Sequence, residues 1–392
     1  MIRSGLITAL LLGIGASPVQ AQDTDESRTW PPWRTSYFPY VTASPNDGVM
    51  GVARLIVFRQ ADFDDRVSLR SAVAVEAGYS TRGSRFASVR ADFPRLADDW
   101  RLAGSARAGK QSHFGVPDGT IDRVRYAGWG EITRRLGGRV QFAVRVAGDH
   151  TALHGDPVEL GARYPYAPTN GCVATQLCIV DDALTQDDAQ VRAAVVLDLR
   201  DREYDPRRGA LIEAGAFAGT AADGYHGAYA LGSGWLTPRE GTRVTARAGL
   251  RALSNAGAIA ALHEIPAWDR PITVLGGYSS HRALGEGEQV GRGVLLAGLE
   301  VRHDVMNFGG LAALSVIGFV DGGRVFVDPS PLADPDPSRP YNNGDLRLTL
   351  DDWTWGVGGG FSLRILRAAQ LTMTVGRADG QTRIYVGAGT AW

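Results

Sequence analysis

The stretch Arg139-Val140-Gln141-Phe142-Ala143-Val144-Arg145-Val146 decides the fold of this 392-residue chain. Its apolar residues alternate with Arg and Gln, and successive side chains of a strand point to opposite faces of a sheet. The same alternation returns in 243–251, which reads RVTARAGLR, and in 66–70, which reads RVSLR. Strict alternation of this kind predicts strands whose two faces meet different environments.

The composition excludes several other classes of protein. Hydrophobic residues make up 44% of the chain and Gly accounts for 50 residues. This apolar content is too high for a fully disordered chain, and only one window, near the N-terminus, approaches a continuous apolar run, which excludes a helical membrane protein. Lys and Arg number 41 and Asp and Glu 42, so the net charge is −1. We expect no nucleic-acid partner, because such a partner would need a basic face.

The first 21 residues have the form of an export signal. Arg3 supplies a positive charge, 6–14 is apolar, and Val19-Gln20-Ala21 is a small-residue cleavage site. An N-terminal membrane anchor is the alternative, but the apolar core is shorter than the ~20 residues that a span needs. We therefore assign 1–21 to a signal peptide, 22–33 to a short periplasmic segment, and 34–392 to a transmembrane β-barrel.

Cys172 and Cys178 lie close together in a polar stretch. An exported protein meets an oxidising environment, which favours a local disulfide between these two cysteines. Free thiols and a metal site are the alternatives, although the segment offers too few further ligands for a metal ion. We expect no metal site and no other cofactor.

The apolar face of each strand meets either a second sheet, as in a sandwich, or lipid, as in a barrel. Three features favour the barrel: the polar faces are rich in Arg, the strands recur to the end of the chain, and the final residues alternate up to Trp392. Tyr385 and Trp392 belong to a terminal strand that resembles the closing strand read during assembly of outer-membrane barrels. Lipid cannot satisfy an open strand edge, so the sheet has to close.

The pattern predicts an all-β fold, a 16-stranded antiparallel transmembrane β-barrel. The predicted strands are 34–44, 49–60, 66–80, 84–94, 99–110, 124–135, 138–149, 189–200, 209–219, 225–237, 243–254, 294–304, 310–324, 352–366, 369–378 and 382–392. Every long connection follows an odd-numbered strand: 111–123, 150–188, 255–293 and 325–351. Long loops on one side and short turns on the other are typical of barrels integral to the bacterial outer membrane, in contact with its lipid.

The segment LGGYSSHRAL at 275–284 precedes two strands that each carry one carboxylate, LLAGLEVR at 295–302 and SVIGFVDGGR at 315–324. This order resembles the barrel of the BamA/TamA superfamily, the bacterial surface antigen family. Its members have a Gly-Gly loop motif ending in Val-Arg-Gly-Phe/Tyr, then a strand with Glu, then a Phe-x-Asp-x-Gly strand. The resemblance implies supporting roles for Gly276, Gly277, Phe319 and Gly323.

The alternation itself points Glu300 and Asp321 into the barrel, because their neighbours on the other face are apolar. We predict that the long 255–293 loop folds into the lumen, where Arg282 forms a charge-assisted latch with both carboxylates. The alternative is a solvated Arg282, with the carboxylates paired to other arginines of the lumen. Of the four-residue loop motif only Arg282 is kept, since His281, Ala283 and Leu284 depart from it.

A second segment carries Asp198, Asp201, Pro206 and Gly209, and is similar to an Asp/Pro/Gly turn of the same superfamily. These residue types are also ordinary components of turns. We interpret Asp201, Pro206 and Gly209 as structural.

The resemblance implies a protein that aids insertion or transport of proteins or lipids at the outer membrane. Family members usually carry periplasmic repeat domains before the barrel, and none fits in 22–33, so a separate periplasmic protein partner and an unfolded protein or lipid client are expected. A passive or gated anion-favouring pore is the alternative, and a structural surface barrel is a third possibility. The sequence holds no nucleophile elbow and no phosphate loop, so we expect no enzyme.

Overall fold

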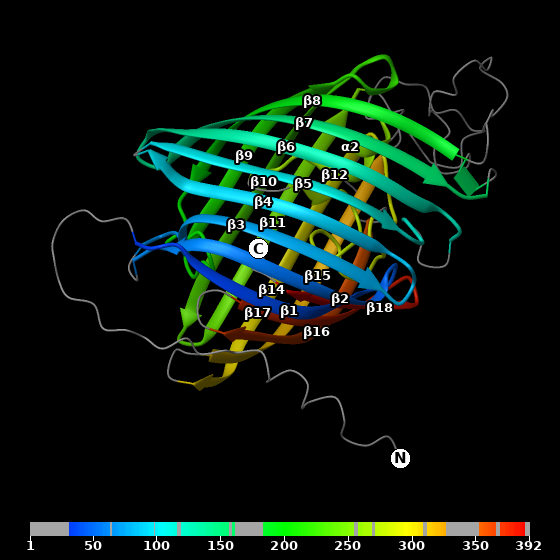
Figure 1. Cartoon of the computed structure of the whole chain (residues 1–392). Helices are drawn as coiled ribbons and strands as arrows, with labels where there is room; N and C mark the ends of the chain where they lie inside the picture. The colour runs from blue at the N-terminus through cyan, green and yellow to red at the C-terminus, as the bar shows by residue number, and fades with distance from the viewer. Residues whose placement is uncertain are drawn as a thin grey trace.

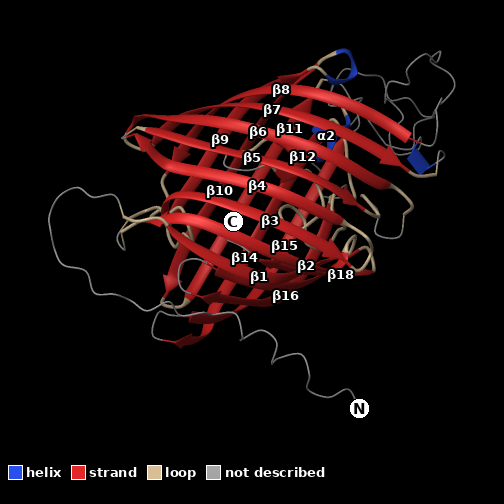
Figure 2. Ribbon diagram, viewed as in Figure 1, coloured by secondary structure: helices blue, strands red, loops and turns tan. Residues whose placement is uncertain are grey.

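Sixteen antiparallel strands of the described residues close into a barrel in the structure, a computed structural model (Figure 1). The structure describes residues 31–62, 65–97, 99–115, 119–156, 159–160, 183–254, 258–268, 271–308, 312–326, 353–365 and 369–388. The predicted signal peptide, both cysteines and Trp392 lie outside these residues. Figure 2 shows that strands account for most of the described chain.

The barrel strands are β1 (Arg34–Ser44), β2 (Gly48–Gln60), β3 (Leu69–Ser80), β4 (Arg85–Ala97), β5 (Trp100–Gln111), β6 (Asp122–Gly137), β7 (Val140–His154), β8 (Ala183–Asp198), β9 (Gly209–Gly219), β10 (Tyr225–Arg239), β11 (Thr242–Leu253), β14 (Gly293–Phe308), β15 (Ala312–Phe326), β16 (Thr354–Ile365), β17 (Ala369–Ala378) and β18 (Gln381–Ala388). Each strand pairs with the next one along the chain, β14 pairs with β11, and β18 pairs with β1. The predicted fold class is therefore confirmed.

Some predicted strand ends are wrong. β8 begins at Ala183 instead of 189, and β7 runs on to His154. These ends read as polar sequence, because a strand that extends beyond the lipid needs no apolar outer face. β3 begins at Leu69 instead of 66, where its register with β2 shifts, and Val67 is 6% exposed instead of facing outward.

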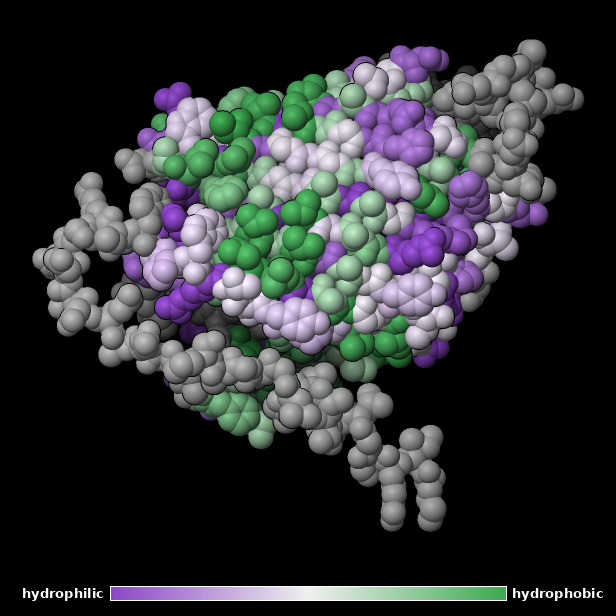
Figure 3. Space-filling model, in the orientation of Figure 1, coloured by the Kyte–Doolittle hydropathy of each residue, from purple (hydrophilic) through white to green (hydrophobic). Residues whose placement is uncertain are grey.

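The wall of the barrel is apolar outside and polar inside. Phe142 and Val146 are 39% and 62% exposed, whereas Gln141 and Arg145 between them are 9% and 2% exposed. Figure 3 shows hydrophobic side chains gathered over the middle of the wall, with hydrophilic ones toward both ends. This is the pattern of a barrel whose outer face meets lipid. No helix in the described ranges is long and apolar enough to cross a membrane.

The lumen is filled by the connection between β11 and β14, as predicted. This connection carries α2 (Ile259–His263), β12 (Glu264–Ile265) and β13 (Ile272–Thr273), and η2 (Ala221–Asp223) lies in another loop. Ile265 and Leu275 are fully buried and belong to one apolar cluster with residues of the barrel wall. The connection therefore packs as a small hydrophobic core inside the barrel, and burial of its apolar side chains stabilises that position.

Candidate latch in the lumen

Arg282 is the centre of a buried ion-pair cluster between the lumen loop and two neighbouring strands. Its Nε and Nη2 donate to the two carboxylate oxygens of Asp321, over 2.8 and 3.0 Å, and its Nη1 donates to Glu300. The backbone N–H of Arg282 also donates to Asp321, over 3.0 Å. The three side chains are 3%, 0% and 7% exposed. The structure thus brings the three predicted residues together in a bidentate, charge-assisted arrangement.

The strands β14 and β15 set the positions of the two carboxylates. Glu300 lies opposite Phe319 in the sheet, and Gly298 lies opposite Asp321. Within each strand, the two residues named are separated by one residue. Because side chains two residues apart share a face, the carboxylates and the Phe319 ring all point into the lumen. The guanidinium carbon of Arg282 lies 3.8 Å from the centroid of the Phe319 ring, a cation–π contact.

A second arginine, Arg247 on β11, shares the Asp321 carboxylate, which the sequence analysis missed. Its Nη2 lies 3.1 Å from Asp321 Oδ1, and its guanidinium group also donates to the carbonyl oxygens of Ser279 and Ser280 in the loop. Gly298 lies between Arg247 and Asp321 in the sheet, and a Cβ atom there would approach both side chains to under 3 Å. The missing side chain of Gly298 therefore lets the ion pair form across β14.

The electrostatics of the cluster depend on complete pairing. Burial alone would lower the pKa of Arg282, but Asp321 and Glu300 outweigh burial, so the pKa of Arg282 is raised. Arg302 completes the set, because its Nη2 donates to Glu300 Oε1 over 3.0 Å. Removing one member of such a buried group leaves an uncompensated charge, which costs far more than an exposed ion pair is worth.

The glycines of the loop motif shape the segment that carries Arg282. Gly276 and Gly277 have φ values of 103° and 107°, which side chains rarely adopt. On β15, a Cβ atom at Gly323 would collide with the side chain of Leu275, which packs there. These contacts place Gly276, Gly277 and Gly323 at the base of the loop segment, beside the ion-pair cluster.

A second anchor holds the same loop on a different part of the wall. The backbone N–H of Trp268 donates to both oxygens of Glu213, over 2.7 and 2.8 Å, and the carbonyl oxygen of Pro266 accepts from Arg192 over 2.8 Å. Arg192 also forms ion pairs with Glu213 and Glu131, and all three side chains are buried. Alternation shows that these charged residues point inward. Their pairing depends on strand register, which the sequence pattern does not display.

Tyr385 ties the last strand to the loop. Its hydroxyl donates to the carbonyl oxygen of Leu284 over 2.5 Å, and the residue is 3% exposed. Arg383, also on β18, lies 3.4 Å from Glu288 of the loop. The assembly role predicted for Tyr385 stays a prediction, and the structure adds this inward contact.

The 199–208 turn that joins β8 and β9 is built by the predicted turn residues. Asp198 is fully buried against Arg200 and Arg66, at 2.9 and 3.2 Å. Asp201 Oδ1 accepts hydrogen bonds from the backbone N–H groups of residues 202, 207 and 208. Gly209 has a φ of 104°, and a Cβ atom there would collide with the carbonyl group of Leu199.

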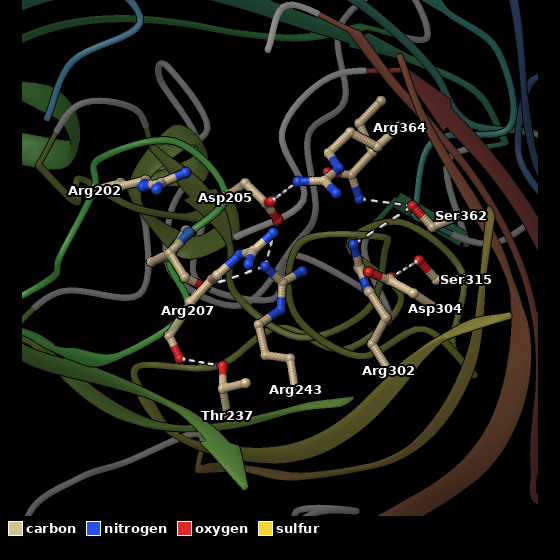
Figure 4. A network of polar contacts seen from close by, with 12 residues as sticks. Arg202, Asp205, Arg207, Thr237, Arg243, Arg302, Asp304, Ser315, Ser362 and Arg364 are labelled. Atoms are coloured by element: carbon tan, nitrogen blue, oxygen red, sulfur yellow. Dashed lines mark hydrogen bonds and ion pairs between the residues drawn. The ribbon is translucent and has the colours of Figure 1, made fainter. Parts of the chain in front are cut away.

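The same turn reaches across the end of the lumen. Asp205 pairs with Arg243 on β11 and with Arg364 on β16, the latter over 2.6 Å (Figure 4). The carbonyl oxygen of Pro206 accepts from Arg243 over 3.1 Å, and Glu203 pairs with Arg101 on β5 over 2.8 Å. The turn is thus held to widely separated strands, a role that its ordinary turn composition does not reveal.

The described parts of the first and last strands pair over a short stretch. Among the described residues, Ala43 and Val386 are the only aligned pair between β1 and β18. By contrast, β1 is aligned with β2 along its whole length, from Arg34 opposite Phe58 to Ser44 opposite Gly48. Among the described residues, this junction, which we call the seam, has fewer aligned pairs than the other strand junctions.

Comparisons with known proteins concern the fold. No family model and no curated protein matches the chain. The structure of BamA from Haemophilus ducreyi lacking POTRA domains 1-3 is similar, with a TM-score of 0.57 and 13% identity, over 91% of this chain and 70% of that one. CdiB from Escherichia coli is also similar, with a TM-score of 0.53 and 11% identity, over 93% of this chain and 64% of that one. The fold of this chain is similar to those of BamA and CdiB, and the predicted resemblance is confirmed at the level of the fold.

Proposed function

We propose that this chain is an integral outer-membrane protein that aids insertion or transport of a protein or lipid client through the seam. The short pairing between the described residues of β1 and β18 carries the proposal. A strand edge with unpaired backbone groups is a template on which another strand can add. The similarity in fold to BamA and CdiB supports this role. A separate periplasmic protein would deliver the client, and no covalent reaction is involved.

The lumen loop would be mechanically coupled to the seam. Arg282 pins the loop to β14 and β15, and Tyr385 connects the same loop to β18. Movement of the loop would therefore change the support of the last strand, on one side of the seam. This contact gives a physical route from the latch to lateral opening.

The experiment closes the seam with a disulfide. Directly opposed residues of antiparallel strands lie about 4.5–5.5 Å apart, within reach of a disulfide. Ala43→Cys with Val386→Cys would be made in a background in which Cys172 and Cys178 are Ser. The barrel, reconstituted in liposomes, would be offered a urea-unfolded eight-stranded outer-membrane barrel as client. We expect faster client folding with the reduced protein than with empty liposomes, and loss of that gain on oxidation.

The matched control keeps Ala43→Cys and moves its partner to Val49 on β2, where the strands are already fully paired. Oxidation of this variant should leave client folding unchanged. Equal effects of both cross-links, or no acceleration by the reduced protein, would contradict the proposal.

An anion-favouring pore remains the competing function, and it requires an open lumen. Two arginines of the lumen are engaged: Arg145 pairs with Glu131, and Arg251 donates to carbonyl oxygens of Ala261 and Gly291 in the loop. A steady, anion-selective current through the wild-type barrel in a planar bilayer would favour the pore over the proposal.

A further inference from the structure

A small cavity at the turn end of the barrel is lined by four arginines (Figure 4). They are Arg207 from the β8–β9 turn, Arg243 on β11, Arg302 on β14 and Arg364 on β16. The cavity measures about 50 Å³. Roughly 10–15 Å³ is needed for each water molecule, so the space suits a few waters or one small anion.

Positive charge is in excess around this cavity. Its two acidic lining residues are Asp205, which Arg243 and Arg364 share, and Asp304, which accepts a hydrogen bond from Ser315 over 2.6 Å. The Nε atoms of Arg243 and Arg302 are buried without a hydrogen-bond partner among the described residues. The side chains of these two arginines are 12% and 8% exposed. Buried donors of this kind are costly unless a ligand or water accepts from them.

We propose that this cavity binds a phosphate-type oxyanion, either free phosphate or the headgroup of a phospholipid. Guanidinium groups present planar pairs of donors that match the oxygens of a phosphate. Thr237 and Thr242 also line this space. The site shares Arg302 with the ion-pair cluster around Arg282, but it includes no residue of the seam, so it stands or falls apart from the proposed function.

The test measures phosphate binding to the refolded full-length chain in zwitterionic detergent by isothermal titration calorimetry, with chloride at equal ionic strength as reference. Arg207→Gln removes a lining arginine whose exposed side chain makes no hydrogen bond or ion pair with other described residues, so the fold should be kept. Loss of one charge-assisted hydrogen bond predicts about tenfold weaker binding. Arg364→Gln, which removes a second lining arginine, should also weaken it.

The matched control is Arg208→Gln, the next residue of the same turn, which is exposed and lies outside the cavity lining. It should bind phosphate like the wild type. Glycerol 3-phosphate separates the two sources: tighter binding than inorganic phosphate assigns the site to a lipid headgroup, and equal or weaker binding assigns it to free phosphate. No binding of either probe, or equal binding by wild type and Arg207→Gln, overturns the proposal.

Discussion

Arg282 attaches the lumen loop to β14 and β15 through several buried hydrogen bonds. It satisfies Asp321 with two side-chain bonds and a backbone bond, and it satisfies Glu300 as well. A neutral side chain at this position would leave both carboxylates with fewer donors in a buried site. The cost of that loss exceeds the worth of the ion pair itself, because the remaining charges stay buried.

We therefore predict that Arg282→Ala weakens docking of the loop by about 3–5 kcal/mol. Single-channel recording in planar bilayers should show a nearly closed wild type and a variant that opens or flickers. Arg208→Ala, on an exposed turn, is the control and should behave as the wild type. If the Arg282 variant is as silent as the wild type, the latch is not what keeps the loop in place.

Gly298 offers a subtler test of the same cluster. A Cβ atom at this position would lie 2.7 Å from Arg247 Nε and 2.8 Å from Asp321 Oδ1. Gly298→Ala should therefore separate Arg247 from Asp321. We expect its channel to open or flicker as the Arg282→Ala channel does, but less often. Gly318, on the outer face of β15, has open space around it, so Gly318→Ala is the matched control.

His281 should make docking of the loop sensitive to pH. Burial lowers the pKa of His281 below its ordinary 6.5, and Asp321 only partly offsets burial. Nε2 lies 3.1 Å from the carbonyl oxygen of Thr354, and Nδ1 has no hydrogen-bond partner among the described residues. The docked loop thus binds fewer protons than the released loop, so its stability is present above the released-state pKa and is lost as pH falls.

Channel recordings at about pH 7.5 and pH 5.5 would check this sign, since these values bracket the histidine pKa. The wild type should flicker more at the lower pH, and His281→Val should lose most of that dependence. The same pH response in both proteins would assign it to another group.

The three latch residues could be predicted from the sequence, and their neighbours could not. Alternation places Glu300 and Asp321 on the inner face, and the resemblance draws attention to Arg282. Arg247 also points inward by alternation, but its contact with Asp321 depends on the register of β11, β14 and β15 and on the gap at Gly298. The register between strands that a long loop joins cannot be predicted from the sequence of either strand alone.

At the scale of elements, the lumen loop is held at two places on the wall. Trp268 and Pro266 bind Glu213 and Arg192, while Arg282 binds β14 and β15. Buried apolar residues such as Leu275 lie between the two anchors. The loop therefore behaves as a packed element of the fold, whose release requires breaking polar contacts at both places.

We predict that Glu213→Gln destabilises the barrel by about 1–3 kcal/mol, because Arg192 loses a buried charge partner and Trp268 loses an acceptor. Thermal unfolding in detergent, followed by circular dichroism, would measure it as a lower Tm. Glu240→Gln, at an exposed turn, is the control. Equal Tm values for the two variants would show that this second anchor contributes little.

Elements could be predicted from sequence wherever lipid imposes a pattern on them. The sixteen strands, their order and the inward loop follow from alternation, whereas the ends of β7 and β8 extend into polar sequence that alternation does not mark. The β8–β9 turn shows the same limit, since nothing in its composition indicates that Asp205 reaches Arg243 and Arg364.

At the scale of the whole molecule, the lumen is obstructed by two separate segments. The 258–291 loop fills its interior, and the 199–208 turn crosses one end. Each is attached to strands that lie far apart around the barrel. Opening the lumen fully therefore requires both segments to move.

We predict that Asp205→Asn alone leaves the barrel nearly closed, because the loop stays in place. Combined with Arg282→Ala, it should give a larger current than Arg282→Ala alone. The two singles and the double variant would be compared in the same planar bilayers. A double variant no more conductive than Arg282→Ala would show that the turn does not restrict the lumen.

The place of the loop in the chain has a consequence for the order of folding. Residues 258–291 come before β14 to β18, so Arg282 is synthesised before Glu300, Asp321 and Tyr385. A loop that lies on the concave side of the first eleven strands is enclosed when the last five complete the ring. Tyr385, which meets Leu284, belongs to the strand that completes it. The barrel is thus expected to form around its own contents, with closure as the final step of maturation.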